Sequence, residues 1–102
     1  MFDINETLQS STLGTIVSHN REDLEHYYVE FPNGKMLSVL RGESEYGEGH
    51  IGGDNGGVET AVMVREGFFG IPSFDEEQHD FSRVIDTPEE LVKEVERVAA
   101  LV

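Results

Sequence analysis

Residues 25–41, EHYYVEFPNGKMLSVLR, constrain the fold most strongly, because they predict two strands joined by a tight turn. The runs HYYVEF and KMLSVL flank Pro32-Asn33-Gly34, and Asn-Gly tolerates the positive φ angles of a two-residue hairpin turn. A turn centred on Asn33-Gly34 places Phe31 opposite Met36. Both faces of this hairpin are partly apolar, so the pattern does not decide which face meets the core.

The C-terminal segment predicts an amphipathic helix. Thr87 supplies an N-cap hydroxyl, Pro88 suits the first helical position, and Glu90 stands three residues after the cap. The apolar residues that recur at helical spacing are Leu91, Val95, Val98 and Val102. The charged residues expected on the opposite side are Lys93, Glu94, Glu96 and Arg97. Such a short helix is unstable alone in water, so we expect it to cover a face of the sheet.

Two further segments predict strands. Residues 13–18 are rich in β-branched side chains, and residues 58–66 alternate in the manner of a half-buried strand. Residues 1–12 fit either a loose arm or a short helix, and residues 74–85 are acidic and irregular. We therefore expect a single α+β domain over residues 1–102. It should consist of an antiparallel sheet of about three to five strands with the C-terminal amphipathic helix packed on one face.

Charge is the strongest compositional signal, since 21 acids stand against seven bases and give a formal net charge of −14. Such a surface repels nucleic acid and anionic membranes and favours basic partners. The chain has no cysteine, which rules out a disulfide framework and a thiolate metal site. It begins without the basic and apolar segments of a signal peptide and holds no apolar run of membrane length, so we expect a cytoplasmic protein.

The glycine-rich stretch at 41–57, RGESEYGEGHIGGDNGG, contains GEGHIG, which matches the spelling G-x-G-x-x-G. A dinucleotide site also needs a helix that starts within the motif, whereas glycines follow here and the neighbouring acids would repel a pyrophosphate. The ligand order of a calcium loop is absent as well. We therefore interpret the stretch as a connection between strands.

Motifs for metal binding and catalysis are missing. The four histidines, at 19, 26, 50 and 79, form no H-x-x-x-H pair, and the chain has no nucleophile elbow and no phosphate loop. We expect no catalytic activity, no cofactor and no metal.

Two stretches without Lys or Arg, residues 42–64 and 66–82, include the predicted strand 58–66 and its flanks. Aromatic side chains are interleaved with their acids, a composition typical of protein–protein contacts; the alternative is a solvated face with the aromatics folded beneath it. The residues predicted to contact a partner are Glu43, Glu45, Tyr46, Glu48, Asp54, Asp75, Glu76, Glu77 and Asp80.

The order of these segments resembles a family of short proteins encoded by bacteriophages. The resemblance spans residues 29–98 and rests on FPNGKMLSVLRGESEYG, a glycine-rich gap, VETAVMV and HDFSRVIDTPEELVKEV, with Leu91 where the family has valine. The family is largely without assigned activity, so it implies no catalytic residues. It implies a phage gene product in the cytoplasm of a bacterial host, where small acidic phage proteins often disable proteins that handle nucleic acid.

Three functional hypotheses follow. The leading one is a phage-encoded inhibitor that binds a basic, nucleic-acid-handling host protein, for example a CRISPR effector, without direct contact to nucleic acid or membrane. The second is a non-catalytic accessory phage protein that self-associates through an apolar sheet face with Tyr28, Leu37 and Val39. The third is a small ligand- or metal-binding domain centred on His50 and the glycine stretch. The sequence leaves open whether the protein is a monomer or a homodimer.

Overall fold

The computed structural model describes residues 2–11, 13–43, 50–51, 57–66, 70–78 and 82–101. The order of elements within these ranges is α1 (Ile4–Gln9), β1 (Thr15–Ser18), β2 (Leu24–Glu30), β3 (Lys35–Glu43), β4 (His50–Ile51), β5 (Val58–Glu66), β6 (Ile71–Phe74), β7 (Ser82–Ile85) and α2 (Pro88–Ala99).

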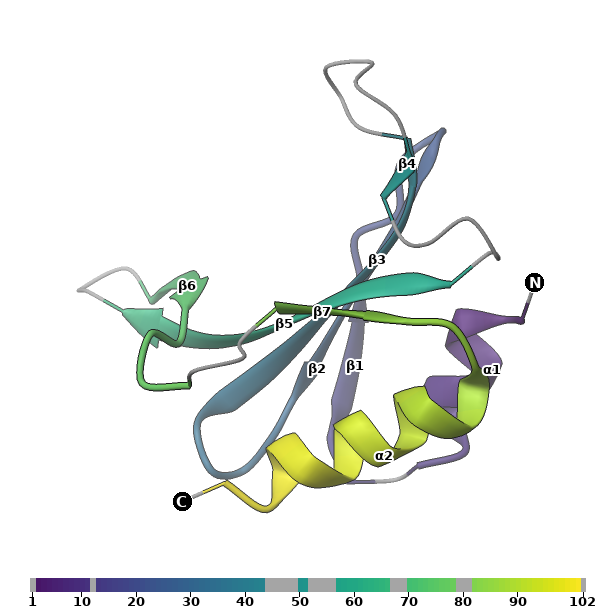
Figure 1. The fold of residues 1–102 in the computed structure, drawn as a ribbon. Coiled ribbons are helices and arrows are strands. Elements are labelled where there is room, and N and C mark those ends of the chain that lie inside the picture. Colours follow the sequence, from purple (N-terminus) through teal and green to yellow (C-terminus); the bar gives the residue numbers. More distant parts are fainter. Residues whose placement is uncertain are drawn as a thin grey trace.

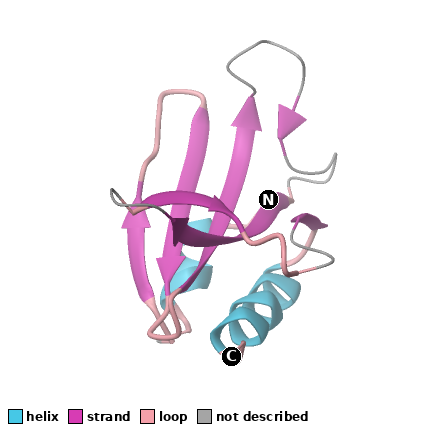
Figure 2. Cartoon of the chain, turned by 90° about the vertical axis from the view of Figure 1, so that its left-hand side faces the viewer, coloured by secondary structure: helices cyan, strands magenta, loops and turns pink. Residues whose placement is uncertain are grey.

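The strands form one antiparallel sheet in the order β1-β2-β3-β5-β6, with β4 paired to β3 and β7 paired to β5. Both helices lie on the same side of this sheet, with α1 beside the first turns of α2 (Figure 1). In the turned view of Figure 2, strands in front cross the long strands behind them, so the sheet is strongly twisted. The predicted α+β class is confirmed, and the sheet has more strands than the three to five expected.

The β2–β3 hairpin forms where it was predicted, but its register differs by one residue. Glu30, rather than Phe31, pairs with Met36. The loop is three residues long, because the Gly34 N–H donates to the Phe31 carbonyl at 3.2 Å and the Phe31 N–H donates to the Lys35 carbonyl at 3.0 Å. Within this turn Gly34 takes a positive φ, of 84°, and Asn33 does not, so the turn uses one left-handed residue instead of two.

Asn33 has a different role from the one its Asn-Gly motif predicts. Its Nδ2 amide donates to the carbonyls of Val98 and Leu101, both at 2.9 Å, and of Ala99 at 3.3 Å. Its Oδ1 atom accepts the Lys35 N–H at 2.9 Å. The hairpin turn therefore satisfies the last carbonyls of α2 and fixes the end of the helix against the sheet.

The core lies between the helices and one face of the sheet. The buried apolar residues of this cluster are Ile4, Leu8, Tyr27, Val29, Phe31, Leu37, Val39, Val58, Val62, Ile85, Leu91, Val95 and Val98. The one-residue shift places Leu37 and Val39 in the core, whereas Tyr28 lies on the opposite face. These three residues were predicted to share an apolar interface, and that prediction is wrong.

The expected C-terminal helix is present as α2. Thr87 Oγ1 accepts the Glu90 N–H at 3.2 Å, which is the predicted N-cap, and Leu91, Val95 and Val98 are buried. Glu94 was expected on the solvent side, but it is buried. Its carboxylate pairs with Arg97 one turn on and lies 3.6 Å from Arg83 Nε on β7.

The N-terminal segment folds as a short helix, one of its two expected forms. Asp3 caps it, because Asp3 Oδ1 accepts the Glu6 N–H at 3.0 Å, and Ile4 and Leu8 enter the core. Residues 74–85 are less irregular than expected, since β6 ends at Phe74 and β7 spans 82–85, both on the same edge of β5. Val84 on β7 is 57% exposed.

Candidate functional site

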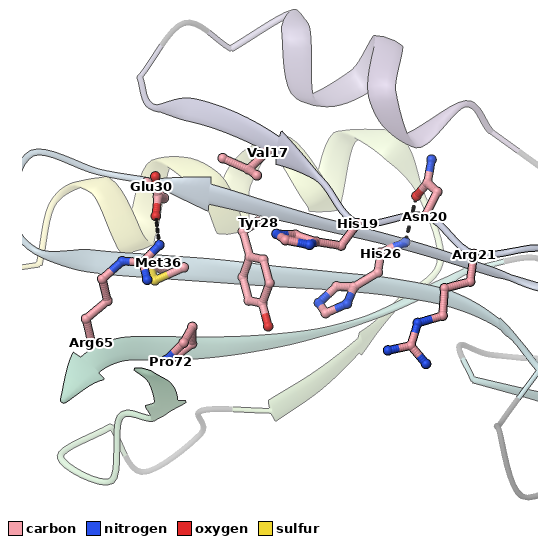
Figure 3. Close-up of a pocket in the computed structure, with 10 residues that line it drawn as sticks. All are labelled: Val17, His19, Asn20, Arg21, His26, Tyr28, Glu30, Met36, Arg65 and Pro72. Atoms are coloured by element: carbon pink, nitrogen blue, oxygen red, sulfur yellow. Dashed lines mark hydrogen bonds and ion pairs between the residues drawn. The ribbon is translucent and has the colours of Figure 1, made fainter. Parts of the chain in front are cut away.

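Alternation along the strands brings a set of polar and aromatic side chains to the face opposite the helices. The β1–β2 hairpin continues beyond its strands, because the His19 N–H donates to the His26 carbonyl and the Arg21 N–H to the Leu24 carbonyl, both at 2.8 Å. His19 and Arg21 therefore point to the same side as His26 and Tyr28 on β2. Together with neighbouring residues they line an open cleft of about 600 Å³ (Figure 3).

An aromatic cluster forms the middle of this cleft. The ring centroids of His26 and Tyr28 are 4.5 Å apart, and those of His19 and Tyr28 are 5.4 Å apart in an edge-to-face arrangement. The two imidazole centroids lie 6.0 Å from each other. Burial lowers the pKa of His26, and the nearby His19 and Arg21 lower it further. The His26 ring is therefore predominantly neutral at neutral pH.

An ion pair closes the other end of the cleft. Arg65 on β5 pairs with Glu30 on β2, so its side chain extends across β3, and its Nη1 donates to the Gly70 carbonyl at 2.9 Å. Met36 lies on β3 between these strands and is buried, although it faces away from the helices. Met36 and Pro72 thus give this end of the cleft an apolar floor (Figure 3).

His26, which lines the cleft, forms with the buried Ser38 beneath it a pair that has the elements of a base and a nucleophile. His26 Nε2 and Ser38 Oγ are 3.2 Å apart. Ser38 is only 3% exposed, however, and the group that affects His26 from outside the ring cluster is the cation Arg21 rather than an orienting carboxylate. The pair is best interpreted as a structural hydrogen bond that satisfies a buried hydroxyl.

The structure describes the side chains of three of the nine predicted contact residues, Asp75, Glu76 and Glu77. Glu76 and Glu77 are exposed in the turn after β6. The residues that lie outside the described part of the structure are Glu45, Tyr46, Glu48, Asp54 and Asp80, together with the side chain of Glu43. The aromatic Phe74, which accompanies this stretch, is 53% exposed.

Asp75 is the predicted contact residue that the structure corrects. It is 3% exposed, and its carboxylate lies 2.6 Å from Lys35 Nζ on β3. Burial alone raises the pKa of Asp75, but the hydrogen bonds from Lys35 and the Glu77 N–H and the Lys35 charge together hold it below its ordinary value. An ionised, internally paired carboxylate of this kind is not available to a partner.

Most of the Lys and Arg side chains form ion pairs with acids of the same chain. Five of the seven bases take part in the pairs Lys35–Asp75, Arg41–Glu25, Arg65–Glu30, Arg83–Glu94 and Arg97–Glu94. The acids of these pairs are all buried or half-buried. Ten further acids are exposed in the described residues: Asp3, Glu6, Glu22, Asp23, Glu76, Glu77, Asp86, Glu89, Glu90 and Glu96. The described surface is therefore strongly negative.

Some of these exposed acids border a groove between the two helices, which we call the helix groove. It has a volume of about 410 Å³ and is lined by Phe2, Asp3, Glu6, Thr7, Ser10, Pro88, Glu89 and Val92. Arg41 fixes one wall, because its Nη1 donates to the Phe2 carbonyl at 2.7 Å and its guanidinium lies 5.5 Å from the Phe2 ring centroid. The groove thus combines carboxylates with an apolar lining.

Two further findings, on metal ligands and on membrane-spanning helices, apply to the described part of the chain. No group of three or more His, Asp or Glu side chains is placed there to hold a metal ion. None of the helices described is long and apolar enough to cross a membrane. Residues 44–49 and 52–56 of the glycine stretch and the His50 side chain, at the centre of the ligand-binding hypothesis, lie outside the described residues.

Comparison with protein-family models, curated proteins and solved structures finds no match for this chain. The resemblance to bacteriophage-encoded proteins therefore stays a prediction.

Sequence reasoning missed both the cleft and the helix groove. The cleft had a signal, because His19-x-Arg21 and His26-x-Tyr28-x-Glu30 place like-facing residues two apart on adjoining strands. The strand register is needed to show that these side chains lie next to one another on one face of the sheet. The helix groove had no such signal, since Glu6 and Glu89 are far apart in sequence and only the packing of α1 on α2 brings their helices together.

Proposed function

We propose that this protein is a phage-encoded, non-catalytic inhibitor that binds a basic, nucleic-acid-handling protein of a bacterial host. The observation that carries the proposal is the imbalance of surface charge. Five bases are engaged in ion pairs with acids that are buried or half-buried, while ten other acids of the described residues are exposed. A protein groove built for phosphates is lined with Lys and Arg, and such a negative surface complements it.

We place the contact at the helix groove. The carboxylates of Asp3, Glu6 and Glu89 offer partners for Lys or Arg, while Phe2 and Val92 offer apolar surface to the stems of those side chains or to a neighbouring apolar residue. The occupant that fits is a basic segment of the host protein that also carries apolar side chains. The acids at 43–80 predicted from the sequence are the competing location.

Electrostatic complementarity predicts two properties of binding to the partner. Association should be fast, because the net charge of −14 attracts a basic surface over distance. It should also weaken with salt, because the Debye length falls from about 10 Å at 0.1 M salt to about 3 Å at 1 M. The bound carboxylates would then stand where nucleic-acid phosphates normally bind, so binding and inhibition are the same event.

The test is capture from a bacterial lysate on the immobilised protein, followed by competition. We expect the retained protein to be basic and to be released by duplex DNA or by high salt. The DNA binding of that purified partner should fall as increasing amounts of the protein are added. If the retained proteins resist both DNA and salt, or if they keep binding DNA in the complex, the proposal is wrong.

Self-association is a second candidate, because the edge formed by β6 and β7 carries exposed apolar residues. Ile71 is 62% exposed, Val84 57% and Phe74 53%. A homodimer through this edge would bury them, and its sedimentation would be insensitive to salt because the contact is apolar. Sedimentation velocity distinguishes the two: a monomer at all protein concentrations removes this candidate and leaves the inhibitor proposal unaffected.

A further inference from the structure

The hairpin turn that holds the end of α2 contains a residue pair with its own reactivity. In an Asn-Gly pair the backbone nitrogen of the glycine can attack the side-chain amide carbon of the asparagine, because glycine has no Cβ to obstruct the approach. Asn33-Gly34 is such a pair, and a second one, at 55–56, lies outside the described residues. For Asn33 the structure shows what surrounds both reacting groups.

Hydrogen bonds hold both reacting groups of this pair. The Asn33 Nδ2 amide donates to three carbonyls at and just after the C-terminal end of α2, at distances of 2.9 to 3.3 Å. Its Oδ1 atom accepts the Lys35 N–H, and the Gly34 N–H donates to the Phe31 carbonyl at 3.2 Å. The reaction joins Asn33 Cγ to the Gly34 nitrogen and expels Nδ2, so it cannot proceed while the bonds to α2 persist.

We propose that Asn33 is a site of spontaneous deamidation and that contact between the hairpin turn and the end of α2 controls its rate. When this end of α2 detaches, the Gly34 nitrogen forms a bond to Asn33 Cγ and gives up its proton. The bond from Cγ to Nδ2 breaks, and the amide nitrogen leaves as ammonia with that proton. Water then opens the resulting cyclic imide at one of its two carbonyls, which yields aspartate or isoaspartate without any oxidation or reduction.

The product cannot restore the original contact with α2. A carboxylate at position 33 offers no N–H to the carbonyls of Val98, Ala99 and Leu101, which then lose their hydrogen-bond donor. It also adds a negative charge at the negative end of the helix dipole. Each detachment that lasts long enough for the reaction therefore leaves a permanent chemical change that keeps the end of α2 free.

The test compares the full chain with a peptide of residues 29–38 in the same mildly alkaline buffer. Mass spectrometry of proteolytic fragments follows the replacement of the Asn33 amide by a carboxyl group, and the peptide has no α2 to hold that amide. We expect deamidation in the full chain to be at least about tenfold slower, because three hydrogen bonds must break first. Equal rates would overturn the proposal. The measurement involves no partner, so its result is independent of the inhibitor proposal.

Two variants test whether the end of α2 controls the reaction. Ala99→Gly weakens the last turn of α2, which the Asn33 amide contacts, and Thr87→Ala removes the N-cap at the opposite end at a similar cost. We expect Ala99→Gly to speed deamidation of Asn33 about threefold or more, and Thr87→Ala to change it less than about twofold. Equal acceleration by both, or none by Ala99→Gly, would overturn the proposal.

The deamidated chain itself gives a second readout. Separated from the unmodified chain by anion exchange, it should have a Tm at least about 5 °C lower, as should Asn33→Asp, because the end of α2 has lost its donor. An unchanged Tm would show that deamidation leaves α2 in place and would overturn the consequence proposed for it.

Discussion

The buried pair of Asp75 and Lys35 gives the sharpest test of the structure. Asp75→Asn removes the charge and keeps the shape, and the Asn Oδ1 can still accept the Glu77 N–H as Asp75 Oδ1 does at 3.3 Å. The backbone hydrogen bond from the Asp75 N–H to the Val62 carbonyl, at 3.0 Å, is unaffected. The substitution therefore deletes the ion pair and leaves the Lys35 ammonium beside a neutral amide.

The expected loss of stability follows from how deeply the two side chains of this ion pair are buried. Breaking a fully buried pair costs about 3–5 kcal/mol, because a charge is left without a partner in the interior. The side chain of Asp75 is 4% exposed and that of Lys35 is 13% exposed, so the ammonium can regain some water. We expect Asp75→Asn to lower the free energy of unfolding by about 2–3 kcal/mol, which corresponds to a fall in Tm of about 10–20 °C for a domain of this size.

The assay is urea denaturation of the wild type, Asp75→Asn, Lys35→Met and the double variant. The double-mutant cycle should give a coupling energy of about 1.5–2.5 kcal/mol between the two side chains. A coupling below about 0.5 kcal/mol, the value typical of surface pairs, would refute the burial argument. The variant with both substitutions is the control for lost packing, since it leaves no unpaired charge.

The pH dependence of this stability has a defined sign. The folded-state pKa of Asp75 is lowered from 3.8, so its contribution is fully present above the unfolded-state pKa and is lost as the pH falls through the folded-state value. The difference in stability between wild type and Asp75→Asn should therefore be constant from pH 7 to about 5 and shrink below about pH 4. A difference that grows on acidification would contradict the lowered pKa.

The remaining predictions concern the ends of α2. Asn33→Asp replaces the amide that donates to the carbonyls of Val98, Ala99 and Leu101 with a carboxylate at the negative end of the helix dipole. It should cost about 2–3 kcal/mol in urea denaturation at pH 7 and less at pH 3, where the carboxyl is protonated; equal losses at both pH values would contradict this. Thr87→Ala removes the N-cap at the other end and should cost about 1 kcal/mol in the same assay, whereas Thr87→Ser should be nearly neutral.

Local sequence signals predicted the parts of the fold that depend on neighbouring residues. The cap at Thr87 and the buried stripe of Leu91, Val95 and Val98 are properties of one helix, and they were predicted correctly. The hairpin strands were also predicted, but Asn33 was assigned a positive φ because Asn-Gly usually forms a two-residue turn. Its actual role, the capping of a helix 65 residues or more along the chain, has no local signal.

The main failure of the sequence-based prediction concerns which charged side chains are buried. Asp75 begins an Asp-Glu-Glu run that is typical of a solvated turn. It is nevertheless buried, because Lys35 on β3 forms an ion pair with its carboxylate. Glu94 belongs to the charged residues of α2, yet it is buried because its carboxylate pairs with Arg83 on β7 and with Arg97. In both cases a base distant in sequence decides which acid is buried, and that information exists only once the strands are arranged.

The central claim, that the helix groove is the contact for a basic partner, is tested most directly by comparing two variants of equal charge. Glu6→Gln/Glu89→Gln removes two carboxylates from the groove, and Glu76→Gln/Glu77→Gln removes two from the turn after β6. Their dissociation constants for the captured partner are measured by calorimetry at about 150 mM salt. We predict a loss of about tenfold or more for the groove variant and less than about threefold for the other. An equal or larger loss for the Glu76 and Glu77 variant would contradict the claim.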